Sequence, residues 1–178
     1  MRKHAVIVPI LILASAAFSA AQMDKGKPLS PPASAECKLP DGKTIKTDYS
    51  SPRLRGRKMI GEHDPYGKPW RMGANAATTF VTGADLSVGG KDVPAGSYTL
   101  FAIPNPDQWT LIISKKTGEW GIPYPGEGDD LTRVEMKVSQ LPSKVENFTI
   151  TYEPSSDGCT MNLDWDMTRA SVGIAEKK

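Results

Sequence analysis

Basic side chains gather in one stretch of the chain, between residues 50 and 69. Four of them lie close together: Arg53, Arg55, Arg57 and Lys58. A guanidinium group binds carboxylate or phosphate through forked hydrogen bonds, so this stretch is a candidate for anion binding. The alternative is that these arginines pair with the nearby carboxylates of Glu62, Asp64 and Asp48 and only hold the loop in place.

The neighbouring segment, residues 67–79 (GKPWRMGANAATT), places an aromatic, a guanidinium and an amide side chain close together. Such groups commonly line pockets for sugars or small anions. The alternative is a structural corner, in which Gly73 permits close backbone approach and Asn75 hydrogen-bonds to the loop. The predicted ligand-binding residues are Arg53, Arg57, Tyr66, Trp70, Arg71 and Asn75.

His63 stands between Glu62 and Asp64, which raises the hypothesis of a hydrolase that uses this histidine with one of the two acids. A zinc site needs three or four converging ligands, and beyond residue 21 the chain has one histidine. Neither Ser50 nor Ser51 lies in the G-x-S-x-G turn that exposes a nucleophilic serine. We therefore assign no catalytic residue, no metal and no cofactor.

A second irregular stretch, residues 118–130, contains Trp120 and Tyr124 among several acids. It lacks the regular acidic spacing of a calcium-binding loop. We expect a turn with aromatic side chains that could close over residues 66–75.

Short runs of alternating apolar and polar residues surround these loops, and this two-residue period is typical of half-buried strands. The clearest runs are residues 45–49, 86–88, 98–103, 109–114, 134–138, 148–152 and 159–165. The runs at 98–103 and 109–114 should form a hairpin. The pattern predicts an all-β fold: an antiparallel, jelly-roll-like β-sandwich of eight or nine short strands with long irregular loops, with a closed barrel as the alternative.

The first 21 residues have the features of a signal peptide. Arg2 and Lys3 precede an apolar run over residues 5–17, and small residues lead to a cleavage site before Gln22. The apolar run is shorter than the roughly 20 residues that span a bilayer, and Pro9 interrupts it. We predict an exported protein, periplasmic or extracellular, with no transmembrane anchor after cleavage.

The predicted organisation is a signal peptide (1–21), a disordered tether (22–35), one sandwich domain (36–174) and a short tail (175–178). Cleavage would remove two of the 22 basic residues and leave 20 against 20 acidic residues. A chain without excess positive charge gives no electrostatic reason to expect nucleic-acid binding.

Cys37 and Cys159 are the only cysteines, and in an exported chain they most simply form a disulfide. The bond would join the first strand to the last. In the loop-entropy model it stabilises the fold by roughly 4 to 5 kcal/mol, less any strain.

Several blocks of sequence resemble the bacterial exported family known as domain of unknown function 2911. They are SSPRLRGRKMIG, PYGKPWRMGANAATT, VGGKDVPAGSYTLFAIP, WTLIISKKTGEWG and LDWDMTRASV, in this order between residues 37 and 174. The resemblance implies an extracytoplasmic all-β domain and no particular reaction. The family usually has Gly-Gly-Leu or a similar sequence before Pro-Tyr-Gly, whereas this chain has Glu62, His63 and Asp64 nearby, so His63 does not fit a family-wide catalytic role.

These observations favour a non-catalytic module that binds a glycan fragment or a small anionic ligand. The first alternative is a structural or interaction protein of the cell envelope. The second is the hydrolase described above.

Overall fold

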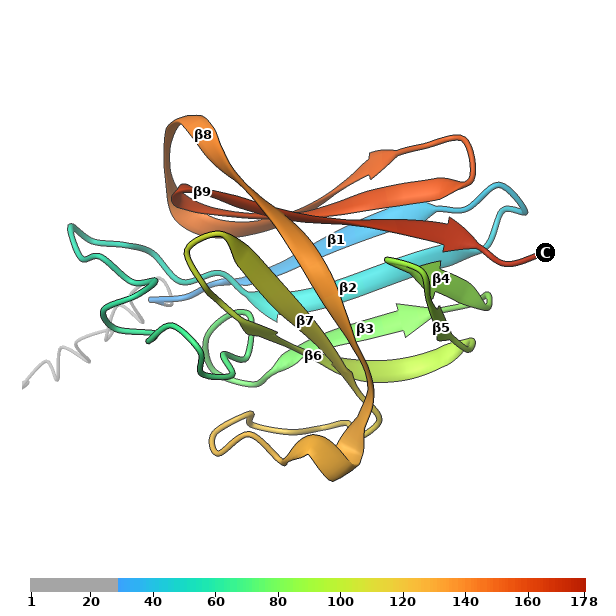
Figure 1. Cartoon of the computed structure of the whole chain (residues 1–178), viewed down its shortest axis with the longest axis horizontal. Coiled ribbons are helices and arrows are strands. Elements are labelled where there is room, and N and C mark those ends of the chain that lie inside the picture. The colour runs from blue at the N-terminus through green and yellow to red at the C-terminus, as the bar shows by residue number, and fades with distance from the viewer. Residues whose placement is uncertain (1–28) are drawn as a thin grey trace, which may run out of the picture.

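The computed structural model describes residues 29–178, so the predicted signal peptide and residues 22–28 of the predicted tether lie outside it. The described chain is all-β, as predicted, and its helical content is one short 3₁₀ turn, η1 (Glu127–Asp129) (Figure 1). The nine strands are β1 (Pro32–Lys38), β2 (Thr44–Ser50), β3 (Thr78–Thr82), β4 (Leu86–Val88), β5 (Lys91–Val93), β6 (Gly96–Ile103), β7 (Gln108–Ser114), β8 (Asp130–Pro154) and β9 (Gly158–Glu176).

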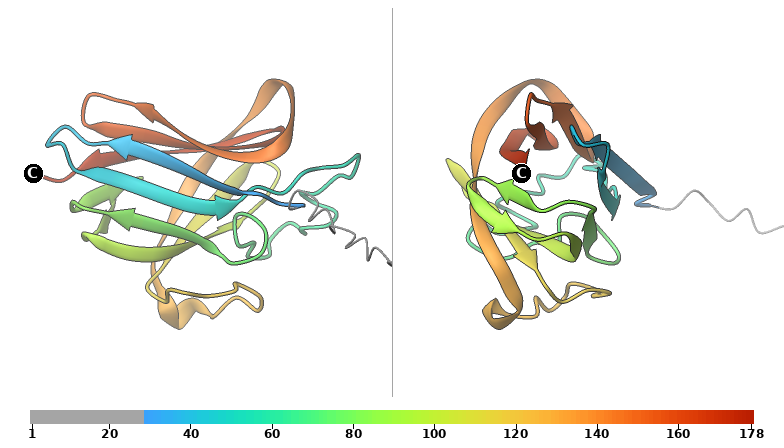
Figure 2. Two further views of the ribbon diagram at one scale, coloured as in Figure 1. Left: turned by 180° about the vertical axis from the view of Figure 1, so that it is seen from behind. Right: turned by 90° about the vertical axis from the view of Figure 1, so that its right-hand side faces the viewer.

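All strands pair antiparallel in one continuous sheet, in the order β1-β2-β3-β6-β7-β8-β9-β4-β5. The sheet curls so strongly that β1 contacts β8 and β9, and Figure 2 shows it wrapped around a central core. The two halves therefore face each other as in a sandwich. No ladder joins β1 to β5, so the sheet stays open and the alternative of a closed barrel is not realised.

Alternation along the strands separates the core from the outer face. The predicted hairpin is present, with Leu100 of β6 opposite Ile113 of β7. Leu100 and Ile113 belong to the main core, whereas Phe101 and Ile112 lie in a second, smaller apolar cluster. The second cluster means that β6 and β7 are buried on both faces, as expected for central strands.

An aromatic cluster around Trp70 fills one end of the core. Trp70 stacks on Trp165 with ring centroids 5.4 Å apart, and it meets Phe148 and Trp109 edge to face at 4.8 and 6.3 Å. Edge-to-face and offset stacked pairs add to the stabilisation that burial of these large rings provides.

The last two strands differ from the prediction of short strands. The runs predicted at 134–138 and 148–152 are both parts of the 25-residue β8, which bends where its register with β9 shifts between Gln140 and Thr149. The 19-residue β9 bends at Asp166, where φ is 54°. Its second arm, with Ala170 and Val172 in the core, was not predicted, because polar residues at the bend interrupt the alternation.

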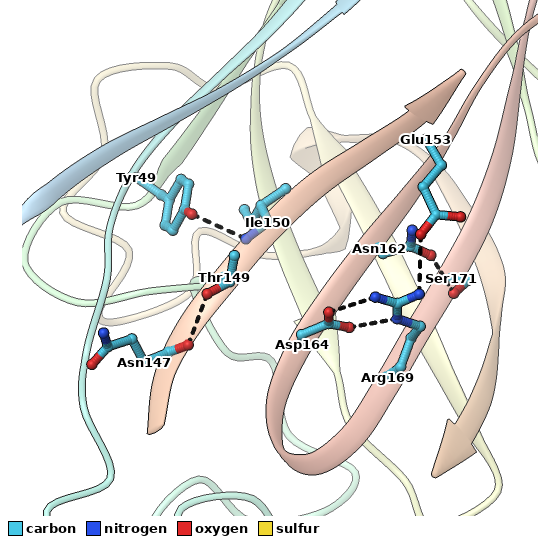
Figure 3. A network of polar contacts seen from close by, with 9 residues as sticks. All are labelled: Tyr49, Asn147, Thr149, Ile150, Glu153, Asn162, Asp164, Arg169 and Ser171. Atoms are coloured by element: carbon cyan, nitrogen blue, oxygen red, sulfur yellow. Dashed lines mark hydrogen bonds and ion pairs between the residues drawn. The ribbon is translucent and has the colours of Figure 1, made fainter. Parts of the chain in front are cut away.

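Polar side chains join the two arms of β9 (Figure 3). Arg169 donates two hydrogen bonds of 2.7 Å to the carboxylate of Asp164 and a third of 3.1 Å to Glu153. Ser171 donates to Asn162 at 2.6 Å. These contacts hold the two arms of β9 together.

The first and last strands of the chain extend past the predicted limits of the domain. Strand β1 begins at Pro32, so residues 32–35 are not part of a tether, and β9 continues to Glu176, which shortens the predicted tail. Ala33 pairs with Tyr49 of β2. The composition of residues 32–35 is typical of disorder, but composition does not show that a partner strand is available to pair with them.

The predicted disulfide between Cys37 and Cys159 is present, and it links β1 to β9. Within residues 29–178, no helix is long and apolar enough to cross a membrane.

Candidate functional site

The candidate site lies at the end of the molecule opposite the C-terminus, where the segment between β2 and β3 projects from the sheet (Figure 1). Trp70 in this segment exchanges two backbone hydrogen bonds with Ala102 of β6, of 2.7 and 2.8 Å. Neighbouring residues in extended backbone point to opposite sides. The indole of Trp70 therefore enters the core, with 7% of the residue exposed, and Arg71 points away from it.

Residues 72–78 then form a tight corner against the end of β2. Thr78 donates from its hydroxyl to the carbonyl of Met72 at 2.6 Å, and the backbone N–H of Ala74 donates to the carbonyl of Ser50 at 3.1 Å. A Cβ atom on Gly73 would lie 2.8 Å from that same Ser50 oxygen, so the approach requires glycine. Asn75 adopts a positive φ of 59°, and its amide donates to the Ser50 hydroxyl at 3.2 Å.

A cleft of about 290 Å³ opens beside this corner. Its walls come from the segment between β2 and β3, from the loop between β7 and β8, and from β9. The lining includes Arg57, Met59, His63, Asp64, Trp70, Arg71, Ile122 and Trp165.

Two guanidinium groups face the cleft, and backbone oxygens position both. Arg57 donates to the carbonyls of Leu54 and Arg53 at 3.0 and 3.1 Å. Arg71 donates to the carbonyl of Trp120 at 3.2 Å and lies over the Trp120 ring, 5.5 Å from its centroid. Partial burial lowers the pKa of Arg71, which means that its charge is incompletely solvated.

The arginines of this region have no carboxylate partner. Within residues 29–178, no carboxylate oxygen lies within 4.0 Å of the guanidinium groups of Arg53, Arg55, Arg57 or Arg71. Glu62 instead pairs with Lys58 at 3.7 Å, and Asp48 pairs with Lys46 at 3.2 Å. The alternative in which the arginines pair with Glu62, Asp64 and Asp48 is therefore wrong.

Asp64 is the one acidic residue that lines the cleft, next to His63. Burial raises the pKa of the Asp64 carboxyl, and the positive charges of His63, Arg71 and Arg57 oppose this shift only in part. The side chain of Asp64 has no salt bridge and no hydrogen bond in the described part of the chain. The cleft therefore combines two guanidinium groups with a carboxyl group whose charge is disfavoured by burial.

A model of the family described as a protein of unknown function (DUF2911) matches residues 30–174. The chain belongs to the DUF2911 family. The match includes every strand from β1 to β8, most of β9, and all the residues of the cleft. No curated protein and no solved structure matches the chain.

Three of the six predicted binding residues of this DUF2911 protein line the cleft: Arg57, Trp70 and Arg71. Arg53 lines an adjoining groove. Tyr66 is 43% exposed and packs beside Gly61, and Asn75 belongs to the corner, so neither reaches the lining of the cleft.

Three apolar residues of the lining were not predicted as site residues: Met59, Ile122 and Trp165. Trp165 is far from the corner in sequence and showed only the alternation of a core residue. Ile122 comes from the loop expected to close over the corner. That loop does approach it, because a Cβ atom on Gly121 would lie 2.9 Å from the Cβ of Arg71.

The two serines considered for a hydrolase have other partners. Ser51 donates from its hydroxyl to the carbonyl of Phe148 at 2.7 Å, and the Ser50 hydroxyl accepts the Asn75 amide. Neither is hydrogen-bonded to His63. Over residues 29–178, no three His, Cys, Asp or Glu side chains are grouped closely enough to hold a metal ion.

Proposed function

We propose that this DUF2911 protein is an exported, non-catalytic module that binds a small anionic ligand in the cleft, and that the ligand is an acidic sugar. The observation that carries the proposal is the pair of guanidinium groups, Arg57 and Arg71, that line one cleft without a carboxylate partner in the described chain. Guanidinium groups held by backbone carbonyls keep their remaining N–H donors free for an anion.

The walls of the cleft support a sugar rather than an inorganic ion. Met59, Trp70 and Ile122 line the same cleft and supply apolar surface. A volume of about 290 Å³ is at the lower end of the range for small-molecule sites, which suits a ligand of about one ring. A sugar carboxylate can bind the guanidinium groups while its ring lies against the apolar wall.

Asp64 supports a ligand with hydroxyl groups. An ionised Asp64 repels an anion, but its carboxyl oxygens accept hydrogen bonds from sugar hydroxyls. A ligand with both a carboxylate and hydroxyls would satisfy the arginines and Asp64 together.

The disulfide between Cys37 and Cys159 is compatible with export, because such bonds persist in oxidising compartments. Export itself remains a prediction from residues 1–21.

Calorimetry with D-galacturonate and its neutral analogue D-galactose tests the proposal. We expect heat from galacturonate only, and a loss of affinity of roughly tenfold or more in Arg71→Ala, because a hydrogen bond to a charged group contributes about 1.5–3 kcal/mol. Lys91→Ala, at an exposed lysine of β5 away from the cleft, is the control and should bind normally. Equal binding of the two sugars, or no binding of either, would overturn the proposal.

A structural role for the same segment is supported by different residues. Trp70 lies within the aromatic cluster, and the Asn75 amide holds the corner to β2. A scaffold alone would explain these two side chains, but it leaves the unpartnered guanidinium groups of Arg57 and Arg71 without a role.

A further inference from the structure

A second groove, of about 390 Å³, adjoins the cleft. It is lined by Leu29, Ser30, Pro52, Arg53, Arg55 and Arg57. Ser30, Pro52 and Arg57 also line the cleft, so the two depressions share a wall. A ligand that leaves the cleft past Arg57 would enter the groove.

Within residues 29–178, the guanidinium groups that line the groove form no ion pair with a carboxylate. The Nε atom of Arg53 is buried and has no hydrogen-bond partner among residues 29–178. Arg55 donates to the carbonyl of Leu29 at 3.1 Å, which is a neutral acceptor. Glu146 accepts the backbone N–H of Arg55 at 2.7 Å, but no guanidinium group lies within 4.0 Å of its carboxylate.

The charges of the two depressions add up to a strong positive excess. Arg53, Arg55, Arg57 and Arg71 line them together, against the single carboxyl group of Asp64. Burial raises the pKa of that carboxyl group. A ligand with one anionic group in the cleft would leave the guanidinium groups of Arg53 and Arg55 without an ion-pair partner in the described part of the chain.

We infer that the ligand is a chain with repeated anionic groups, one in the cleft and at least one more in the groove. This inference rests on the proposed function. Two linked anionic groups bind more tightly than one, because the second group binds at a high effective concentration once the first is held. Acidic oligosaccharides and polyphosphates share this chemistry, and the apolar wall of the cleft favours the oligosaccharide.

Calorimetry with galacturonate, trigalacturonate and tripolyphosphate tests the inference. We expect trigalacturonate to bind at least tenfold more tightly than the single sugar. In Arg55→Gln this ratio should fall to near one, since Arg55 lines only the groove, and Arg55→Lys should restore part of it by returning the charge. Lys91→Ala is again the control.

The outcomes separate the inference from the function on which it rests. If galacturonate binds and trigalacturonate binds no more tightly, the inference fails and the proposed function stands. An unchanged ratio in Arg55→Gln also overturns the inference. Absence of binding by the sugar and both chains overturns the proposed function as well. An Arg55-dependent gain with trigalacturonate supports the inference, and tighter binding of trigalacturonate than of tripolyphosphate identifies the sugar acid as the source of the anionic groups.

Discussion

At the scale of single residues, Trp70 and Arg71 divide two tasks between neighbouring positions. The indole of Trp70 packs in the aromatic core, while Arg71 lines the cleft with its guanidinium group over the ring of Trp120. Strand geometry makes this division possible, because successive side chains leave the backbone in opposite directions. A core residue, Trp70, is therefore followed directly in sequence by a residue of the candidate site, Arg71.

Trp70→Ala should lower the free energy of unfolding by about 3–5 kcal/mol, because it leaves a cavity among Phe148, Trp109 and Trp165. Trp120 is 60% exposed, so Trp120→Ala should cost less than about 1 kcal/mol. Urea denaturation of both variants provides the comparison. Similar losses in both would show that Trp70 does not carry the core contacts described here.

Asp64→Asn should raise the melting temperature at pH 7. Burial raises the pKa of Asp64, so its neutral form is favoured in the fold. The stability contributed by neutral Asp64 is fully present below 3.8, the ordinary pKa of the carboxyl group in the unfolded chain. It is lost as the pH rises through the higher pKa of the folded protein. Asparagine is neutral throughout, so the advantage of the variant should shrink towards pH 3 in thermal melts. A variant less stable than the wild type at pH 7 would contradict this account.

The same substitution should tighten the binding of galacturonate at pH 7, by roughly threefold to tenfold, because it removes a negative charge beside Arg57 and Arg71. The gain competes with the loss of a hydroxyl acceptor, since an amide offers one oxygen in place of two. Calorimetry at two salt concentrations checks the electrostatic origin, which requires a smaller gain at high salt.

At the scale of elements, two irregular segments are fixed by contacts to the sheet. The corner before β3 is closed against Ser50, and the loop between β7 and β8 covers the apolar patch of Phe101 and Ile112 with Tyr124. Tyr124 meets Phe101 edge to face, with ring centroids 5.1 Å apart. The cleft between these segments therefore has walls held by packing on a rigid sheet.

Gly73→Ala should destabilise the protein by about 1–3 kcal/mol, because a Cβ atom there would lie 2.8 Å from the carbonyl oxygen of Ser50. Gly56 also has a positive φ, of 73°, but no atom lies within 4 Å of the position of its Cβ. Gly56→Ala therefore measures backbone strain alone and should cost less. Thermal melts that rank the two variants the other way would contradict the described corner.

Tyr124→Phe should lower stability by about 1–3 kcal/mol, because the Tyr124 hydroxyl hydrogen-bonds to Asp130 and accepts from Arg133 at 3.3 Å. Burial, together with the hydrogen bond to Asp130, raises the pKa of Tyr124 to about 12. The stability from its neutral phenol is thus complete below pH 10 and is lost as the pH rises through about 12.

Ultraviolet titration measures this directly. The wild type should show a tyrosine that ionises near pH 12, and this transition should be missing in Tyr124→Phe. Tyr66→Phe is the matched control, since Tyr66 is 43% exposed, and it should change stability by no more than about 0.5 kcal/mol.

At the scale of the whole molecule, side-chain contacts join strands of the curled sheet that are not paired through their backbones. The disulfide joins β1 to β9, and the hydroxyls of Thr47 and Tyr152 are hydrogen-bonded at 2.6 Å. Tyr49 accepts the backbone N–H of Ile150 at 3.0 Å, as Figure 3 shows. The Tyr49 hydroxyl satisfies the backbone N–H of Ile150, and the Thr47–Tyr152 bond joins hydroxyls of β2 and β8.

Replacement of both Cys37 and Cys159 by serine should lower the free energy of unfolding by about 2–5 kcal/mol, because the bond closes a loop over a separation of 122 residues. Urea denaturation under non-reducing conditions checks the effect. The double variant avoids a free thiol. Stability equal to that of the oxidised wild type would contradict a stabilising role for the bond.

The fold class, most of the strands and the disulfide could be predicted from the amino-acid sequence alone. Alternation along a strand, turn residues and two cysteines are local or countable features, so they can be read without coordinates. The corner formed by Gly73 and Asn75 was also among the alternatives that the sequence offered.

Which side chains share the cleft depends on contacts between distant parts of the chain. Trp165 reaches it from β9 and Ile122 from the loop after β7, while Tyr66, next to the corner in sequence, stays outside. The bends of β8 and β9 are likewise results of long-range packing. So is the absence, within residues 29–178, of carboxylate partners for Arg53, Arg55, Arg57 and Arg71. Such packing depends on the curl of the whole sheet, because residues far apart in sequence meet only when distant strands close on one another.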